Sequence, residues 1–328
     1  MKVFTGTEYL KIDIANCFGL DKETWEDRIS WVDKNERVLE AMDGSADSPI
    51  LYRKAVRALR VVQQGAPTNH IMGLDATASG IQIMGAMSGC VRTCKATNLI
   101  NTGKREDIYG SVAGWMNTLP KVKVTRKKIK KPVMTVFYGS TEQPKQALGE
   151  GEALSAFYSA LRNTVPGAYG LMGVFQSHWR SDVEHHSWRL PDGHVARVPV
   201  TETVEKSLEI DEFDHMRYAY RSTILKPQVS SRSLAANIVH SVDGWVVRMM
   251  VRAAAQQGFW LAPIHDCFYT SPNYMNQVRE NYVTIMQWIA KRNLVSSILS
   301  DISGYHVAYT KEQDDISHLI ASAEYALS

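Results

Sequence analysis

The chain has 328 residues, of which 45% are hydrophobic and 22% are charged. These fractions are close to those of ordinary globular proteins, and they exclude collagen, coiled-coil and wholesale disordered structures. There are 37 lysine and arginine residues and 34 aspartate and glutamate residues, so the net charge of +3 says little about binding partners. The length predicts about two structural units, or one large interlocked domain.

Cysteine content and the N-terminus bear on the cellular location. Four cysteines in a chain of this length do not form a disulfide framework, which indicates a reducing compartment. The N-terminus has no apolar signal-peptide core, and charges interrupt every apolar run before it reaches the roughly 18 residues of a membrane span. We therefore expect a soluble, untargeted, cytoplasmic protein.

In the first half of the chain the predicted elements are mainly helical. Apolar residues at helical spacing predict a helix over 21–42 and a second over 48–62, which begins at Ser48 and Pro49. The apolar segment 70–75 is typical of a short buried strand that ends at Asp75. Further helices are predicted over 105–118, 126–138, 150–162 and 168–180.

In the second half, strands alternate with long helices. The predicted elements are a hairpin over 188–200, a helix from 233 to the C-cap Gly258, apolar segments at 260–264 and 267–270, and a helix over 271–292. The turn between the two short apolar segments contains His265 and Asp266. A carboxylate is therefore expected at the tip of this hairpin.

Asp75 and Asp266 are the acidic residues that we find at the ends of buried-looking strands. Two carboxylates that converge on one edge of a sheet supply hard oxygen ligands for Mg²⁺ and leave coordination positions open for substrate phosphates. Taken alone, however, each aspartate could equally cap a turn or pair with an arginine.

A basic segment lies between Asp107 and Glu142, where there is no acidic residue. Seven of its eleven central positions are basic: Lys121, Lys123, Arg126, Lys127, Lys128, Lys130 and Lys131. On a helix, Arg126 and Lys130 share a face, and Tyr138 lies two turns farther along. Such a face can hold a nucleotide triphosphate at one end and test its sugar at the other. A solvated helix that binds nucleic-acid backbone without specificity has the same pattern, and spacing alone leaves both interpretations open.

Three ordered segments contain these residues: Asp75-Ala-Thr-Ala-Ser79-Gly80-Ile-Gln82, Arg126-x-x-x-Lys130-x-x-x-Met134-Thr135-x-x-Tyr138-Gly139, and Ile264-His265-Asp266-Cys-Phe268. They resemble motifs A, B and C of the single-subunit DNA-directed RNA polymerases of phage and mitochondrial type. Segments 107–110 and 237–244 resemble further parts of that family. The resemblance extends over almost the whole chain, from about Tyr9 to Leu327.

The resemblance implies an α+β, right-hand polymerase fold. The palm, with a small antiparallel sheet, is expected over 1–92 and 241–328, and mostly helical fingers over 93–240. The family's N-terminal promoter-handling domain, its thumb and an arginine-containing palm motif have no counterpart in this sequence. We therefore expect the catalytic subunit of a split bacteriophage RNA polymerase, active in the bacterial host cytoplasm, with the missing parts on a second polypeptide.

The resemblance also implies an activity and roles for individual residues. The expected reaction is DNA-templated addition of NTPs to a nascent RNA. Asp75 and Asp266, with the backbone carbonyl of Ala76, would bind two Mg²⁺, and Lys130 and Arg126 would neutralise the triphosphate. Two residues, Tyr138 and His240, would favour a ribose 2′-OH. The expected nucleic-acid contacts are Ser79, Gly80, Tyr109, Gly139 and His265.

One departure and two alternatives accompany this interpretation. Pro132 within motif B predicts a kinked helix or a later start of its regular part. A family A type DNA polymerase shares motifs B and C, but such enzymes have a glutamate where this chain has Gly80, and an acidic residue where it has Cys267. The other alternative is a non-catalytic nucleic-acid-binding subunit with a polymerase fold, which the intact aspartates and the Lys130 and Tyr138 pair disfavour.

Overall fold

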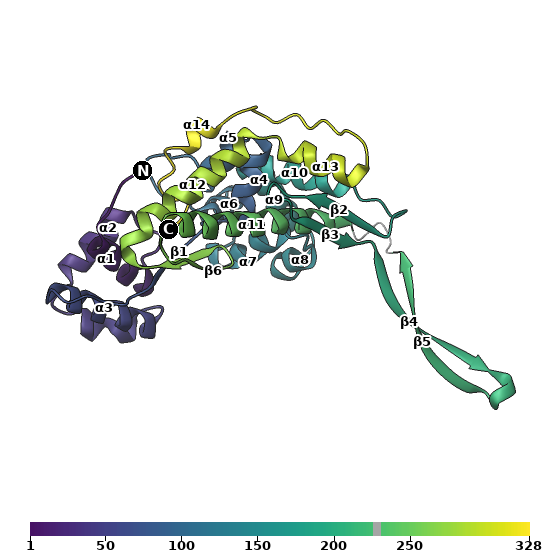
Figure 1. Ribbon diagram of the computed structural model, residues 1–328, viewed down its shortest axis with the longest axis horizontal. Coiled ribbons are helices and arrows are strands. Elements are labelled where there is room, and N and C mark those ends of the chain that lie inside the picture. Colours follow the sequence, from purple (N-terminus) through teal and green to yellow (C-terminus); the bar gives the residue numbers. More distant parts are fainter. Residues whose placement is uncertain (226–230) are drawn as a thin grey trace.

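A three-stranded antiparallel sheet contains the strand end at which Asp75 lies. The computed structural model describes residues 1–225 and 231–328, and the sheet order is β1 (Met72–Asp75), β7 (Cys267–Thr270), β6 (Ala262–Ile264) (Figure 1). In the register of β1 and β7, Asp75 lies opposite Cys267, the residue after Asp266. The two aspartates therefore meet at one end of the sheet, as expected from the sequence.

Helices surround this sheet and account for most of the remaining chain. Within the described residues, the α-helices after β1 are α4 (Ser79–Ser88), α5 (Val91–Ala96), α6 (Ile108–Met116), α7 (Arg126–Val136), α8 (Glu142–Leu148), α9 (Glu152–Thr164), α10 (Pro166–Ser177), α11 (Ser231–Gln256), α12 (Met275–Lys291), α13 (Leu294–Ser303) and α14 (Ser317–Ile320). A short 3₁₀ segment, η4 (Pro272–Tyr274), precedes α12. The predicted α+β class is thus confirmed, and none of the described helices is long and apolar enough to cross a membrane.

The N-terminal elements pack around a small core of their own. They are α1 (Gly6–Phe18), α2 (Trp25–Lys34), the 3₁₀ helix η1 (Leu39–Ser45) and α3 (Pro49–Gln63). The prediction of one continuous helix over 21–42 is wrong. Thr24, not Asp21, caps α2, its hydroxyl oxygen accepting from the Asp27 N–H at 3.2 Å, and the polar stretch after Lys34 forms turns. The main core, by contrast, runs continuously from the sheet into α6, α7, α9 and α10.

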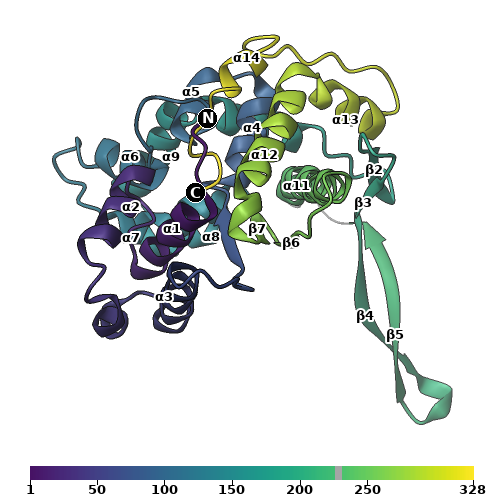
Figure 2. The same ribbon diagram turned by 60° about the vertical axis from the view of Figure 1, so that its left-hand side comes forward.

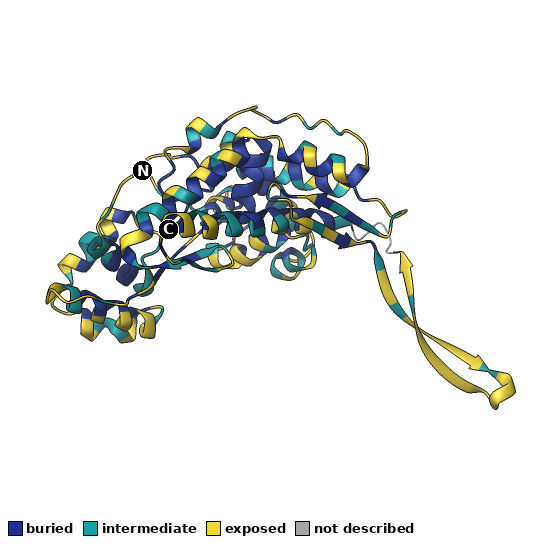
Figure 3. Ribbon diagram, in the orientation of Figure 1, coloured by how far each residue is buried: buried dark blue, intermediate teal, exposed yellow. Residues whose placement is uncertain are grey.

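Two hairpins precede α11, and the second has no counterpart in the predicted elements. The first pairs β2 (His185–Arg189) with β3 (Val195–Pro199), and the second pairs β4 (Thr201–Ile210) with β5 (Met216–Leu225). The β4–β5 hairpin projects from the body as a long arm in both ribbon views (Figures 1 and 2). The arm is mostly exposed (Figure 3). Because neither face of its strands is buried against the body, its sequence lacks the clear alternation of apolar and polar residues that predicts a strand.

The start of α4 is anchored by Gln82, which is fully buried. Its amide nitrogen donates to the Thr77 hydroxyl and to the carbonyls of Thr97 and Ala326, at 3.0, 2.8 and 3.1 Å, while its oxygen accepts from the Tyr282 hydroxyl at 2.7 Å. Because a buried amide is costly unless its partners are present, these bonds hold the segment after Asp75 in one conformation.

A second buried anchor is Arg279 of α12, whose side chain is 2% exposed. Its guanidinium pairs with the Glu324 carboxylate at 2.6 Å and donates to the Tyr9 hydroxyl and the Lys2 carbonyl, both at 2.9 Å. The N-terminal segment, α12 and the C-terminal segment are therefore joined through one cation.

We expect Arg279→Met to lower the free energy of unfolding by about 3 to 5 kcal/mol, because it leaves the Glu324 carboxylate buried without its partner. The matched control is Arg217→Met, which removes an exposed ion pair with Glu209 on the arm and should cost less than about 1 kcal/mol. Urea denaturation measures both. Similar losses for the two variants would contradict a special role for Arg279.

Candidate functional site

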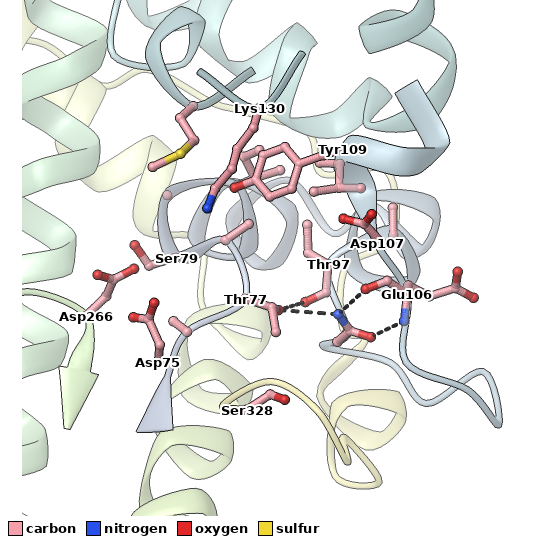
Figure 4. Close-up of a pocket in the computed structure, with 18 of the residues that line it drawn as sticks. Asp75, Thr77, Ser79, Thr97, Glu106, Asp107, Tyr109, Lys130, Asp266 and Ser328 are labelled. Atoms are coloured by element: carbon pink, nitrogen blue, oxygen red, sulfur yellow. Dashed lines mark hydrogen bonds between the residues drawn. The ribbon is translucent and has the colours of Figure 1, made fainter. Parts of the chain in front are cut away.

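A cavity of about 240 Å³ opens beside the end of the sheet at which Asp75 and Asp266 meet. Figure 4 shows Lys130 extending from α7 toward Asp75, Asp266 and Ser79. The predicted site residues that line this cavity are Asp75, Ala76, Ser79, Gly80, Tyr109, Arg126, Lys130, Tyr138 and Asp266. The other three, Gly139, His240 and His265, lie next to lining residues along the chain or in contact with them.

Backbone hydrogen bonds determine where the two aspartates lie. The Ala76 N–H donates to the Asp266 carbonyl at 3.1 Å, and the Ser328 N–H donates to the Asp75 carbonyl at 2.9 Å. The two-residue turn between β6 and β7 requires a positive φ, which His265 adopts at 55°. Histidine is among the residues that tolerate this conformation better than β-branched ones. The turn thus brings the Asp266 side chain to the cavity.

The carboxylates of this site raise one another's cost of ionisation. Burial, and next the charge of Asp266, raise the pKa of Asp75 to about 6, and the Lys130 ammonium opposes the shift. Asp243 of α11 behaves similarly, since burial and then Asp266 raise its pKa to about 6. Among the described residues, Asp75, Asp243 and Asp266 have no ion-pair partner, and close, half-buried carboxylates of this kind favour binding of a hard, oxygen-ligated metal ion. The residues therefore fit the Mg²⁺ expected from the sequence.

The two predicted phosphate-binding cations differ in their surroundings. Among the described residues, Lys130 has no carboxylate partner within salt-bridge distance, so its charge is available to a ligand. Arg126 is held by both Asp107 oxygens, at 2.5 and 3.1 Å, and lies over the Tyr109 ring. Asp107 also caps α6 by accepting from the Gly110 N–H. Arg126 therefore joins α6 to α7 as well as lining the cavity.

Tyr138 lies beyond the end of its helix, unlike the prediction for 126–138. The helix α7 runs through Pro132 without interruption and ends at Val136, and Gly139 closes the following turn with a φ of 83°. The Tyr138 ring packs against His240 of α11, with 4.5 Å between ring centroids. A methyl group on Gly80 would lie 2.9 Å from the Tyr138 hydroxyl, so a side chain at position 80 would displace that hydroxyl.

Sequence reasoning gave no site role to five charged residues that line the cavity, namely Asp21, Lys22, Arg105, Glu106 and Asp107, nor to Asp243, which interacts with Asp266. Asp21, Lys22 and Arg105 line the cavity wall, and Lys22 and Asp21 form an ion pair. Arg105 donates to the Ser328 hydroxyl at 3.1 Å and carries a pKa lowered mainly by burial. These three lie in loops that no motif marks. Asp243 could have been found, because it lies in the segment 237–244 that resembles the family.

A different acidic group lies on the arm, away from the cavity. Glu209, Asp211 and His215 are close enough together to share a cation, but all three are exposed. Their side chains already pair with one another and with Arg217. We assign no metal to them, because exposed acidic groups of this kind are common without an ion.

Comparisons with known proteins identify relatives of the chain. The sequence profile of the family described as DNA-dependent RNA polymerase matches residues 4–147 and 197–325. The DNA-directed RNA polymerase of Pseudomonas phage phiKMV is 24% identical over 85% of this chain and 42% of its own length. The probable DNA-directed RNA polymerase of Neurospora crassa is 24% identical over 82% of this chain and 38% of its own. The human mitochondrial DNA-directed RNA polymerase is 22% identical over 85% of this chain and 28% of its own length.

Each of these relatives is longer, so the chain spans about two fifths of their length or less. Among solved structures, the POL domain of Pol1 from M. smegmatis, in complex with DNA primer-template and dNTP, is similar over 87% of this chain and 63% of its own. The TM-score is 0.42 and the identity 14%. The family profile matches well over half of the sequence, with all three motifs inside the matched segments. The chain therefore belongs to the DNA-dependent RNA polymerase family.

Proposed function

We propose that this chain contains the palm and fingers of a DNA-directed RNA polymerase and adds NTPs to the 3′ end of a nascent RNA opposite a DNA template, releasing pyrophosphate. The observation that carries this proposal is the meeting of Asp75 and Asp266 at one end of the sheet, opposite Lys130, which has no carboxylate partner in the described part of the chain, in a member of this family. The relatives' names support the choice of RNA over DNA synthesis. In this assignment 1–92 and 241–328 form the palm and 93–240 the fingers.

The carboxylates of Asp75 and Asp266, with the backbone carbonyl of Ala76, would hold two Mg²⁺. When bound, these ions would supply positive charge to the phosphates and to the attacking and leaving oxygens. Asp75 ends β1 and Asp266 immediately precedes β7, and these two strands share backbone hydrogen bonds, so neither side chain can move far without the other. Such fixed ligands require little reorganisation during the reaction.

Opposite these carboxylates, Lys130 places an ammonium group at the wall of the cavity formed by α7. A fixed cation here would stabilise the negative charge that develops on the pyrophosphate leaving group. Arg126, held by Asp107, would contribute charge from a rigid position. We also propose that template and primer contact Ser79, Gly80, Tyr109, Gly139 and His265, as the family resemblance implies, because these residues line the cavity or lie beside it.

The sugar of the incoming nucleotide would contact Tyr138 and His240, which pack against one another at the end of α7. A polar group that is left without its partner by a 2′-deoxy substrate costs free energy, and this difference selects NTPs. The second polypeptide expected from the sequence stays a prediction, which copurification from the native source would test.

Asp75→Asn and Asp266→Asn should each abolish nucleotide addition without lowering the thermal midpoint measured in the absence of Mg²⁺, because an amide keeps the shape but binds Mg²⁺ weakly. The measurement is extension of an RNA primer on a DNA template at constant Mg²⁺. Asp182→Asn, at an exposed position outside the cavity, is the control. Activity within a few fold of the parent in either site variant would remove that aspartate from the mechanism.

Stability should depend on both pH and Mg²⁺. Asp75 and Asp243 have folded-state pKa values of about 6, above the ordinary aspartate value of 3.8, so the native chain binds more protons than the unfolded chain between these pH values. Stability contributed by these groups is therefore present at low pH and is lost as the pH rises through about 6. Because Mg²⁺ binds the ionised carboxylates, it should raise the thermal midpoint at about pH 7.5 and far less at about pH 5.

The thermal midpoint, measured with and without Mg²⁺ at both pH values, checks this expectation. In the Asp266→Asn variant the Mg²⁺-dependent rise should be much smaller. An equal rise at both pH values, or one that persists in the variant, would place the bound ion elsewhere.

Tyr138→Phe removes one hydroxyl and should relax discrimination against dNTPs by about 1 to 3 kcal/mol, with a smaller effect on the rate of NTP addition. The ratio of kcat/KM for an NTP and the matching dNTP measures this discrimination. Tyr158→Phe on α9 is a matched control outside the cavity. An unchanged ratio would assign Tyr138 to packing and would favour the DNA polymerase alternative.

A further inference from the structure

We propose that a groove beside α3 is a second nucleic-acid-binding surface, which holds the phosphate backbone of the template or primer outside the candidate site. The choice of nucleic acid as the occupant rests on the proposed function. The groove has a volume of about 620 Å³ and is lined by α3 and by the segment 68–70, which leads into β1. In Figure 1, α3 lies at the end of the molecule opposite to the β4–β5 arm.

The sequence of α3 separates an apolar face from a basic one. The apolar face packs into the small N-terminal core through Tyr52, Ala55, Val56 and Leu59. Three exposed cations, Arg53, Lys54 and Arg57, line the groove instead. Residues three and four positions apart are neighbours on a helix surface, so these side chains form one basic patch about one turn long.

Carboxylates balance little of this charge. None of the residues that line the groove is acidic. The acidic side chains nearby pair with other arginines, Asp43 with Arg53, and Glu36 and Glu40 with Arg60. Among the described residues, Arg57 has no carboxylate within salt-bridge distance, and Lys54 donates to the Ile71 carbonyl at 3.3 Å. Since Arg53 and Arg57 are like charges four positions apart, which destabilises a helix, a bound anion would offset a cost that the chain otherwise carries.

The other lining residues suit a phosphate backbone. Thr68 and Asn69 contribute a hydroxyl and an amide, which with lysine and arginine are usual donors to phosphate oxygens. Apolar surface for the sugars comes from Ala58, Val61 and Ile50, whose side chain is 83% exposed. His70 is buried and its Nε2 lies 2.7 Å from a carboxylate oxygen of Asp13 on α1, which fixes the segment 68–70 in place.

The groove lies close enough to the candidate site for one nucleic acid to reach both. His70 precedes Asp75 by five residues, so their Cα atoms are at most about 18 Å apart. One strand of a duplex covers this length in about five to six nucleotides. A template whose reacting end occupies the cavity can therefore contact the groove with phosphates about five or more nucleotides away.

The test measures nucleic-acid binding and does not depend on catalysis. Labelled primer–template hairpins form two series, in which either the downstream DNA duplex or the upstream RNA–DNA hybrid is lengthened from about 4 to about 14 base pairs, so that only the longer form reaches the groove. Fluorescence anisotropy over a salt series measures the dissociation constant for the full chain, with any partner it requires. The series in which the longer form binds more tightly to the parent chain identifies the bound nucleic acid as DNA duplex or hybrid.

We expect the triple variant Arg53→Gln, Lys54→Gln and Arg57→Gln to bind that longer form about 10- to 100-fold more weakly at about 0.1 M salt. The slope of log K against log salt concentration should fall in magnitude by about 2 to 3, because up to three phosphate contacts are lost. Binding of the short form should stay close to that of the parent.

Three further variants separate charge from folding. Arg57→Gln alone removes an exposed side chain that has no ion pair in the described part of the chain, so it should keep the fold and reduce the slope by about 1. Lys54→Arg with Arg57→Lys keeps both charges and should bind as the parent does. The matched control is Arg162→Gln, Lys291→Gln and Arg292→Gln, which removes three exposed cations outside the groove and should leave binding nearly unchanged.

The inference is overturned if the triple variant binds both longer forms as the parent does, if it loses equal affinity for short and long forms, or if the control loses as much. It is also overturned if the triple variant binds nucleic acid normally but no longer retains a protein that copurifies with the parent, since the groove would then hold an acidic protein. These outcomes leave the proposed function intact, because the parent chain still extends the primer. A parent chain that neither binds nor extends a primer–template would remove the proposed function and this inference with it.

Discussion

The antiparallel pairing of β1 with β7 is the constraint on which the candidate site depends. Its register sets Asp75 opposite Cys267 and joins Ala76 to Asp266 by a backbone hydrogen bond. Because side chains alternate along a strand, a slip of one residue would turn Asp75 to the other face of the sheet and separate the carboxylates. The fully buried Gln82 holds the segment that follows β1, and the hydrogen bonds of Arg279 hold α12 and the two terminal segments beside the sheet. Both residues therefore affect the site by maintaining this register.

This register brings together groups that repel one another. Burial and mutual charge raise the pKa of Asp75 and of Asp243 to about 6, so the chain without a bound cation keeps carboxylates close together at a cost in stability. A fold can keep such an arrangement only where surrounding interactions over-determine it. Here the hydrogen bonds of Gln82 join α4, α12 and the C-terminal segment, and they hold the segment after Asp75 in place despite this cost.

The sequence was informative where local pattern and tertiary structure agree. Short apolar segments bounded by polar turns predicted β1 and the hairpin of β6 and β7, and an i, i+4 pair predicted that Arg126 and Lys130 line one cavity. Prediction from the sequence failed where tertiary contacts determine the local structure. Every residue of α4 is buried, so the helix shows no amphipathic period, and the β4–β5 arm has no core to impose one. The pairing of Arg126 with Asp107 likewise left no local signal.

The position of Tyr138 follows from the same argument. Because α7 ends at Val136, the direction of the Tyr138 ring is determined by His240 and Gly80, which belong to α11 and α4, and not by helical geometry. Both of those helices also bear on the metal end of the cavity, since α4 follows Asp75 directly and Asp243 of α11 interacts with Asp266. The ends of the cavity that we propose to hold the sugar and the metal are therefore built on shared helices. A displacement of α11 would alter the environment of the Tyr138 hydroxyl and that of the Asp266 carboxylate together, so in this proposal substrate choice and catalysis depend on one packing arrangement.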